Sequence, residues 1–152
     1  MSLNQVFDIA GSGMSAQSIR LNTTSSNIAN AETASSSIDK VYRARKPYFS
    51  AIQQDMMGSA GRGFTEAGFS RNKLQSAGVS VDGIIESNVE LEKRYQPDHP
   101  KADDQGFVHY PNVNVVEEMA DMMSASRSFQ TNVEVMNTAK SMMQRVMTLG
   151  QG

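Results

Sequence analysis

Hydrophobic residues recur at helical spacing near both ends of the chain. Near the N-terminus one stripe has members alternately four and three residues apart, the period of a helix that buries a single face. These members are Leu3, Phe7, Ala10, Met14, Gln17, Leu21, Thr24, Ile28 and Ala31. The second stripe, towards the C-terminus, has the same alternation in Val115, Met119, Met122, Ser126, Phe129, Val133, Met136, Lys140, Met143 and Met147. The pattern predicts two amphipathic helices of about 45 Å and about 50 Å, and therefore an elongated molecule.

The middle of the chain has a different character, because it contains all four prolines and six of the eleven glycines fall between Gly58 and Gly83. Extended segments are predicted at 41–46 and 48–52 on either side of Pro47, and again at 79–85 and 107–110. Residues 55–77 contain few apolar side chains, so we expect a mobile loop there.

These patterns predict a mainly α fold with a small β insert, in which the terminal helices pair as a coiled-coil-like rod. The expected organisation is an N-terminal helix in 1–33, a small β-rich middle domain in 34–111 and a C-terminal helix in 112–152. A helical hairpin within a monomer would show the same periodicity, so the pattern alone leaves that alternative open.

Charge is distributed unevenly along the chain. Residues 1–31 carry only Asp8 and Arg20, and 22–27 is a run of Asn, Thr and Ser, which are poor helix formers. A helix of this kind is largely unfolded in isolation and has too few charges for an exposed surface. We therefore expect the N-terminal helix to pack against other protein, which favours an oligomeric sheath.

Composition excludes several classes of function. The formal net charge is −2 with 14 basic and 16 acidic residues, so the chain lacks the positive field that captures nucleic acid. There is no cysteine, which removes disulfides, thiolate nucleophiles and cysteine-ligated metal sites. The sequence has no apolar run of about 20 residues to span a membrane, and its N-terminal residues lack the pattern of an ordinary secretory signal.

The strongest enzyme-like signal is Gly11-x-Gly13-x-x-Ala16, followed by Glu32 at about the distance of a ribose-binding carboxylate. The residues before Glu32 are polar, no second βαβ unit follows, and the heptad pattern continues through both glycines. A nucleotide-dependent cytoplasmic enzyme nevertheless remains an alternative at this stage.

The remaining candidate chemistry is weak. Asp98, His99, Asp103, Asp104 and His109 form a cluster without the spacing of an EF-hand or of a zinc site, so a polar turn is the simpler interpretation. Lys40, Arg43, Arg45 and Lys46, with Tyr42 and Tyr48, favour a solvated or partner-facing strand over a nucleic-acid groove. We therefore assign no catalytic, cofactor-binding or metal-binding residues and expect no cofactor.

Two motifs resemble a known family. The segment 26–33 (SNIANAET) resembles the N-terminal signature of bacterial flagellar axial proteins, the rod, hook and hook-associated subunits. The segments 95–100 (YQPDHP), 106–114 (GFVHYPNVN), 116–119 (VEEM) and 124–132 (SASRSFQTN) are similar to the proximal-rod subunits of that family. The resemblance covers roughly residues 3–35 and 92–149.

The resemblance implies a structural subunit of the flagellar basal body, needed for motility and without catalysis. Its terminal helices would line the inner layer of a tube that transmits torque and carries export substrates. Its partners would be copies of itself, other rod subunits, an adaptor at the MS ring and the flagellar type III export apparatus, with no nucleic acid and no membrane insertion. Export would proceed without a cleaved signal peptide, into the rod that spans the periplasm. A different helical type III export substrate is a further alternative.

Two sets of residues are the candidate sites. The helix seam consists of Phe7, Met14, Leu21, Ile28, Met119, Met122, Phe129, Val133, Met136 and Met143. The family motif consists of Asn27, Asn30, Ala31, Thr33, Pro111, Asn112 and Asn114. We hypothesise that Ala29 and Ala31 let neighbouring helices approach, while the amides of Asn27 and Asn30 fix their register.

Overall fold

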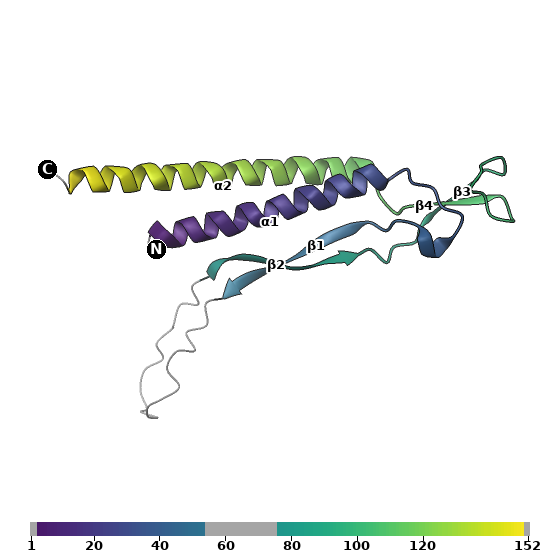
Figure 1. Cartoon of the computed structure of the whole chain (residues 1–152), viewed down its shortest axis with the longest axis horizontal. Helices are drawn as coiled ribbons and strands as arrows, with labels where there is room; N and C mark the ends of the chain where they lie inside the picture. The colour runs from purple at the N-terminus through teal and green to yellow at the C-terminus, as the bar shows by residue number, and fades with distance from the viewer. Residues whose placement is uncertain (1–2, 54–75, 151–152) are drawn as a thin grey trace, which may run out of the picture.

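A computed structural model describes residues 3–53 and 76–150 of the chain. Its two dominant elements are α1, Leu3–Asn30, and α2, Val115–Leu149, which lie side by side and run in opposite directions (Figure 1). The bounds lie within a few residues of those that the four-three pattern predicts. The predicted loop at 55–77 falls outside the described residues except for 76–77, which begin a strand.

The remaining elements confirm a small antiparallel β part. Strand β1, Arg45–Gln53, pairs with β2, Ser76–Glu86, and β3, Glu92–Tyr95, pairs with β4, Phe107–Tyr110. A short 3-10 helix, η1, spans Ile38–Lys40. The fold is therefore mainly helical, with two small two-stranded sheets in the middle of the chain.

Two details of the strands differ from the sequence prediction. Residues 41–44 precede β1, and Pro47 lies inside the strand instead of dividing it. A two-stranded sheet leaves an edge on which proline is tolerated. Strand β3 was not predicted, because Glu-Lys-Arg-Tyr has no apolar alternation. It is held by pairing with β4, where the Arg94 guanidinium lies 4.5 Å from the centre of the Tyr110 ring.

Small side chains allow α1 and α2 to approach closely. Ala10, Ala16, Ala125 and Ala139 are buried. At Gly13 an added Cβ would lie 2.8 Å from Nδ2 of Asn132, so even alanine would displace that side chain. Gly13 and Ala16 of the dinucleotide-like motif thus lie inside a continuous helix that packs against another helix, which is incompatible with a phosphate-binding turn.

The β1–β2 hairpin packs on α1, and α1 lies between this hairpin and α2 (Figure 1). Ser12 ties the hairpin to the helix, since its Oγ accepts a hydrogen bond from the Val79 backbone N–H at 3.2 Å. Gly78 comes so close that an added Cβ would lie 2.4 Å from Ser12 Oγ, and its φ of +136° suits only glycine. The result is three layers in the order α2, α1, hairpin.

Within the described residues, neither helix combines the length and apolar character that a membrane crossing requires.

Candidate assembly site

The junction between α1 and the β insert is built around the fully buried side chain of Asn27. Its Nδ2 donates to the Arg45 carbonyl at 2.8 Å, and its Oδ1 accepts from the Arg45 N–H at 2.9 Å. The same Oδ1 accepts from the Tyr42 hydroxyl at 2.9 Å. The amide therefore pairs with both backbone groups of Arg45, much as a neighbouring strand would.

The other motif residues of α1 form the end of that helix. Asn30 donates from Nδ2 to the Ser26 carbonyl at 2.8 Å, and its own carbonyl accepts from the Thr33 hydroxyl at 2.7 Å. Ala31 is buried beside them. The Thr33 bond satisfies the Asn30 carbonyl, one of those that the end of a helix leaves unpaired.

The second half of the motif joins the insert to α2. Pro111 is buried, and Asn112 accepts at Oδ1 from the Ala44 N–H at 2.9 Å while donating from Nδ2 to the Val89 carbonyl at 2.8 Å. Asn114 caps α2, because its side chain accepts from the backbone N–H of Val116 at 3.1 Å. All seven motif residues thus lie at the two places where the helices meet the insert.

This geometry corrects the hypothesis that the amides of Asn27 and Asn30 set register between neighbouring helices. Both amides bind backbone of their own chain, Asn27 at β1 and Asn30 one turn back in α1. The physical reason is that β1 starts beside the last turns of α1, where an amide can satisfy an N–H and a carbonyl together. Ala31 is buried as expected, whereas Ala29 is exposed.

Glu118 is the ionisable group buried at the same junction. Its side chain is 4% exposed, and Oε2 has no hydrogen-bond partner among the described residues. Burial raises the pKa of Glu118, an effect that the Asn27 amide and the Lys46 ammonium partly offset. Two ion pairs flank this carboxyl, Lys46 with Glu117 at 3.3 Å and Arg20 with Asp121.

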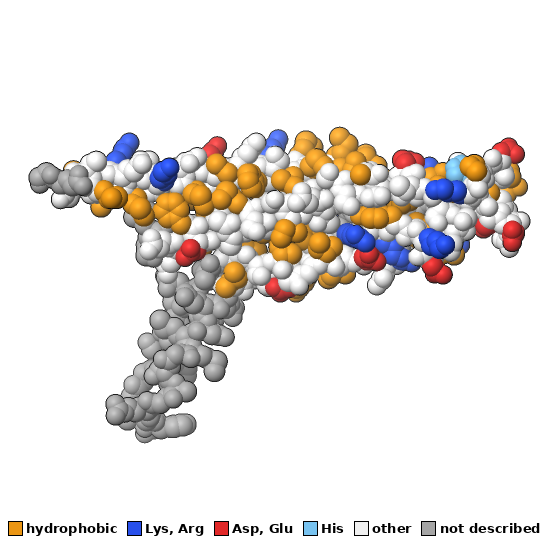
Figure 2. Space-filling model, viewed as in Figure 1, with side chains coloured by type: hydrophobic (Ala, Val, Ile, Leu, Met, Phe, Trp, Pro, Cys, Tyr) orange, Lys and Arg blue, Asp and Glu red, His pale blue; other side chains and the backbone are white. Residues whose placement is uncertain are grey.

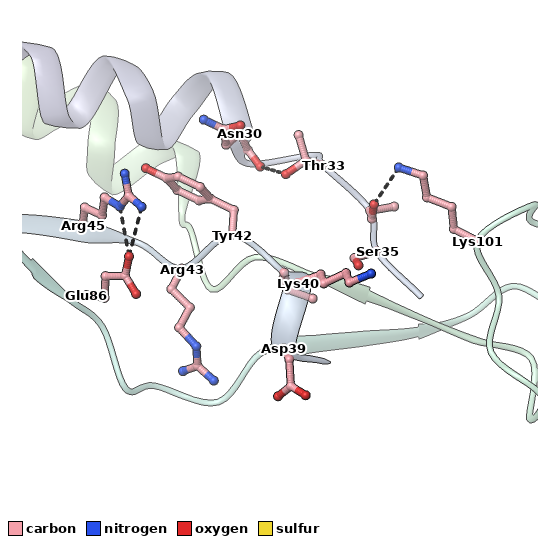
Figure 3. A pocket seen from close by; sticks show the side chains of 12 residues that line it. Asn30, Thr33, Ser35, Asp39, Lys40, Tyr42, Arg43, Arg45, Glu86 and Lys101 are labelled. Carbon is pink, nitrogen blue, oxygen red and sulfur yellow. Dashed lines mark hydrogen bonds and ion pairs between the residues drawn. The ribbon is translucent and has the colours of Figure 1, made fainter. Parts of the chain in front are cut away.

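A cleft of about 530 Å³ opens beside the junction, and basic and acidic side chains line it (Figure 3). Arg45 pairs with Glu86 at 3.0 Å and lies 5.4 Å from the centre of the Tyr42 ring. Lys101 donates to the Ala34 carbonyl at 3.0 Å. Much of the basic and aromatic cluster seen in the sequence is therefore engaged within the chain.

The His and Asp cluster takes part in a turn. Asp103 accepts at Oδ1 from the N–H groups of Gln105 and Phe107 at 2.9 and 2.8 Å, and the Phe107 bond lowers its pKa. His109 is buried, with Nε2 3.8 Å from Asp103 Oδ2. Among the described residues, no group of three such side chains is placed to hold a metal ion.

Two family models match separate parts of the chain. The family described as "Flagella basal body rod protein" matches residues 7–34, most of α1. "Flagellar basal body rod FlgEFG protein C-terminal" matches residues 104–149, which contain β4 and α2. Together they match both ends of the chain and leave most of the insert outside.

Full-length relatives decide the family. The chain is 44% identical over 151 residues to the flagellar basal-body rod protein FlgC of Salmonella typhimurium, with 99% of this chain and 100% of the relative covered. It is 42% identical to FlgC of Yersinia enterocolitica at the same coverage. FlgC of Borreliella burgdorferi is 33% identical over 159 residues, with both chains covered completely. The chain belongs to the flagellar basal-body rod protein family. It is a structural rod subunit and not an enzyme, which removes the nucleotide-dependent alternative.

In the single rod subunit, the α1 members of the predicted seam lie against neighbouring elements. Phe7, Met14, Leu21 and Ile28 are half-buried. On α2 the row Met122, Phe129, Met136 and Met143 is also half-buried, as is Val133.

The predicted α2 stripe contains a second row, seven residues apart, that includes Met119 and Lys140. In the structure the buried row lies one residue earlier. Glu118, Ala125 and Ala139 are buried, whereas Met119 is more than half exposed and Lys140 is exposed. Hydrophobicity alone predicts that Met119 is buried and Glu118 exposed. The close approach of the helices at Gly13 and the contact of Glu118 with the Asn27 junction instead bury the row that contains Glu118. Sequence reasoning missed Glu118 because an isolated glutamate in a helix usually indicates an exposed position.

Apolar side chains also remain exposed along the outer surface of α2 (Figure 2). Towards its C-terminus these include Val135, Met142, Val146 and Leu149. Val6 of α1 joins Val135, Ala139 and Met142 in an apolar groove of about 480 Å³ between the two helices. Contiguous exposed apolar surface is typical of interaction sites, so this part of α2 is a candidate for one.

Proposed function

We propose that this rod subunit polymerises through α1 and α2 into the wall of a tube, with the β insert outside the helical layer. In this arrangement residues 1–33 and 112–152 form the inner layer and 34–111 the outer domain. The tube transmits torque and encloses the path of exported subunits, so motility depends on it. The helices pair there in a coiled-coil-like manner with those of neighbouring subunits.

The observation that carries this proposal is the exposed apolar surface near the C-terminal end of α2. Val135 and Met142 line the apolar groove, and Val146, Met147 and Leu149 are exposed beyond it. In an isolated subunit these side chains face water, whereas in a tube neighbouring helices cover them. Removal of apolar surface from water contributes about 25 cal/mol per Å², so this burial favours assembly.

The composition of the N-terminal helix supports a proposal about export. The N-terminal helix has two charges and a run of Asn, Thr and Ser, so it is weak by itself and gains its stability from packing. A chain of this kind suits passage in an unfolded state through the flagellar type III export apparatus, without a cleaved signal peptide. Its further partners are other proximal-rod subunits and the adaptor at the MS ring.

The test introduces a charge into the groove. Met142→Glu replaces an apolar lining residue, and Gln144→Glu adds the same charge at an exposed polar position two residues along. Each variant is expressed in a strain that lacks its own rod subunit, and the secreted and basal-body fractions are measured separately.

We expect Met142→Glu to be exported but absent from purified basal bodies, with non-motile cells, and Gln144→Glu to assemble normally. Normal incorporation of Met142→Glu would show that the groove is not an assembly surface. Failure of export in both variants with wild-type folding would contradict the export route.

A further inference from the structure

A buried carboxyl group lies where three elements of the subunit meet. Glu118 stands in the first turns of α2, beside Asn27 in the last turns of α1 and Lys46 in the first residues of β1. These elements join at the end of the helices from which the insert extends (Figure 1). Among the residues that the structure describes, Glu118 is the one carboxyl group that is buried. A change in its charge therefore acts on the contacts between the helices and the insert.

The hydrogen bonds around this carboxyl group are incomplete. The Asn27 amide is the side-chain donor that reaches Glu118. Oε2 of Glu118 has no hydrogen-bond partner among the described residues, although an ionised carboxylate can accept about four hydrogen bonds. The ionised form is therefore poorly compensated in this position, and the neutral acid is the form that burial favours.

Burial raises the pKa of Glu118, and the charges that face it do not reverse this effect. On β1 the Lys46 ammonium favours the ionised form, yet it is exposed and pairs with Glu117 at 3.3 Å. On α2 itself, Asp121 and Glu117 disfavour the ionised form. The one charged residue in the second half of α1 is Arg20, whose guanidinium pairs with Asp121. Both of these positive charges therefore already pair with other carboxylates.

The same Asn27 amide holds the start of β1. Its Nδ2 donates to the Arg45 carbonyl at 2.8 Å, and its Oδ1 accepts from the Arg45 N–H at 2.9 Å. Tyr42, a further titratable group at the junction, donates its hydroxyl to that Oδ1 and is linked to Glu118 through the amide. Water that enters to hydrate an ionised Glu118 competes for this amide. The charge of Glu118 therefore affects the two hydrogen bonds that hold Arg45.

We propose that Glu118 is a pH-sensitive switch between the helices and the insert. While it is protonated, Asn27 holds the start of β1 at Arg45. When it ionises, water enters the junction and the two hydrogen bonds between Asn27 and Arg45 open, while the uncharged contact of Ser12 with the Val79 N–H keeps the hairpin on α1. The switch lies within one subunit and outside the apolar groove, so it is independent of the proposed assembly.

The direction of the pH dependence follows from the raised pKa of Glu118. The closed junction favours the protonated acid, so it is fully stable below the ordinary pKa of 4.5 and opens as the pH rises through the raised pKa. Backbone amide exchange of the purified full-length subunit, followed by NMR between about pH 4 and about pH 8, measures this opening. Each rate is expressed as a protection factor, which removes the intrinsic pH dependence of exchange.

We expect the protection of the Arg45 amide to fall with rising pH, by about tenfold for each pH unit that separates the raised pKa of Glu118 from 4.5. The Val79 amide, which Ser12 holds, is the internal reference and keeps its protection. In Glu118→Gln, which is neutral at every pH, the Arg45 amide stays protected throughout. Exposed Glu134→Gln is the matched control and behaves as wild type.

Two variants that break the same exposed ion pair test the role of charge. Lys46→Gln removes the charge that favours ionisation of Glu118 and should move the Arg45 transition to higher pH. Glu117→Gln removes a charge that disfavours ionisation and should move the transition to lower pH. Loss of the ion pair itself would shift both variants in the same direction, so opposite shifts report the charge of Glu118.

Constant protection of the Arg45 amide in wild type over this pH range would overturn the proposal. A parallel fall at Arg45 and Val79 would also overturn it, because the whole hairpin would then come away in place of a local opening. Shifts in the same direction for Lys46→Gln and Glu117→Gln would do the same. If Glu118→Gln does not fold, wild type and the two exposed variants still decide the question.

Discussion

The side chain of Asn27 holds the backbone of Arg45 at two points, with Nδ2 2.8 Å from the carbonyl oxygen and Oδ1 2.9 Å from the amide nitrogen. A single residue of α1 thereby takes the place of a strand partner at the start of β1. The contact joins a helix of the proposed inner layer to the outer insert, and it fixes their relative position together with the Ser12–Val79 and Asn112–Ala44 hydrogen bonds.

Asn27→Ala should lower the free energy of unfolding by about 3 kcal/mol, because it leaves the Arg45 backbone N–H and carbonyl without their side-chain partner and removes one of the two partners of the Tyr42 hydroxyl. The measurement is urea unfolding of the purified subunit followed by circular dichroism. Asn22→Ala, at an exposed position of the same helix, is the control and should change stability by less than about 0.5 kcal/mol. Equal effects of the two substitutions would show that the Asn27 contacts contribute nothing specific.

Gly11 and Gly13 should respond differently to alanine. At Gly11 an added Cβ meets Met136 Cε at 3.9 Å, an ordinary contact, so Gly11→Ala should stabilise α1 by about 1 kcal/mol through helix propensity. At Gly13 the added Cβ displaces Asn132, which cancels that gain. In an Asn132→Ala background, Gly13→Ala should recover about 1 kcal/mol. A double-mutant cycle by chemical denaturation measures this coupling, and a coupling of zero would contradict the close approach of the helices.

Glu118 should make stability depend on pH. Its pKa in the folded subunit is raised above the ordinary 4.5 by burial, so folding favours the protonated form. The stability that this group contributes is complete below the ordinary pKa and is lost as the pH rises through the raised pKa. The Glu118→Gln variant stays neutral, and its free energy of unfolding should therefore fall less than that of wild type between about pH 4 and about pH 8.

Exposed Glu134→Gln is the control for that series and should follow the wild-type pH dependence. Lys46, Glu117 and Asp121 surround Glu118 and are unchanged in both variants. Parallel curves for Glu118→Gln and wild type would mean that the Glu118 carboxylate is not destabilised by burial.

Leu21→Ala and Phe129→Ala should abolish motility while export continues. Both side chains are half-buried in the subunit, and the assembled tube is expected to bury them further. Truncation of a large buried apolar side chain costs about 2–5 kcal/mol, and this loss recurs at every subunit of the tube. Soft-agar motility is measured together with the secreted subunit, and exposed Gln130→Ala is the control. Normal swimming of Phe129→Ala cells would remove Phe129 from the seam.

Much of this protein is determined locally by its sequence. The four-three spacing of apolar residues predicts both helices with nearly correct bounds, because a long amphipathic helix repeats one signal over many turns. Asn114 marks the start of α2, since a cap acts within a few residues of itself. The paired strands around 48–52, 79–85 and 107–110 are also local signals, carried by β-branched and aromatic residues.

Tertiary structure alone decided which positions face one another. Strand β3 has no pattern of its own and exists through its pairing with β4. The buried row of α2 contains Glu118 instead of Met119. Two contacts place it there, the close approach of Gly13 to Asn132 and the contact of Glu118 with the Asn27 amide. Each contact joins residues about 90–120 positions apart in sequence, so the period of a single helix cannot reveal it. The role of Asn27 could likewise not be predicted from the sequence. Its side-chain amide can bind many backbone groups, and only the fold brings the backbone of Arg45 beside it.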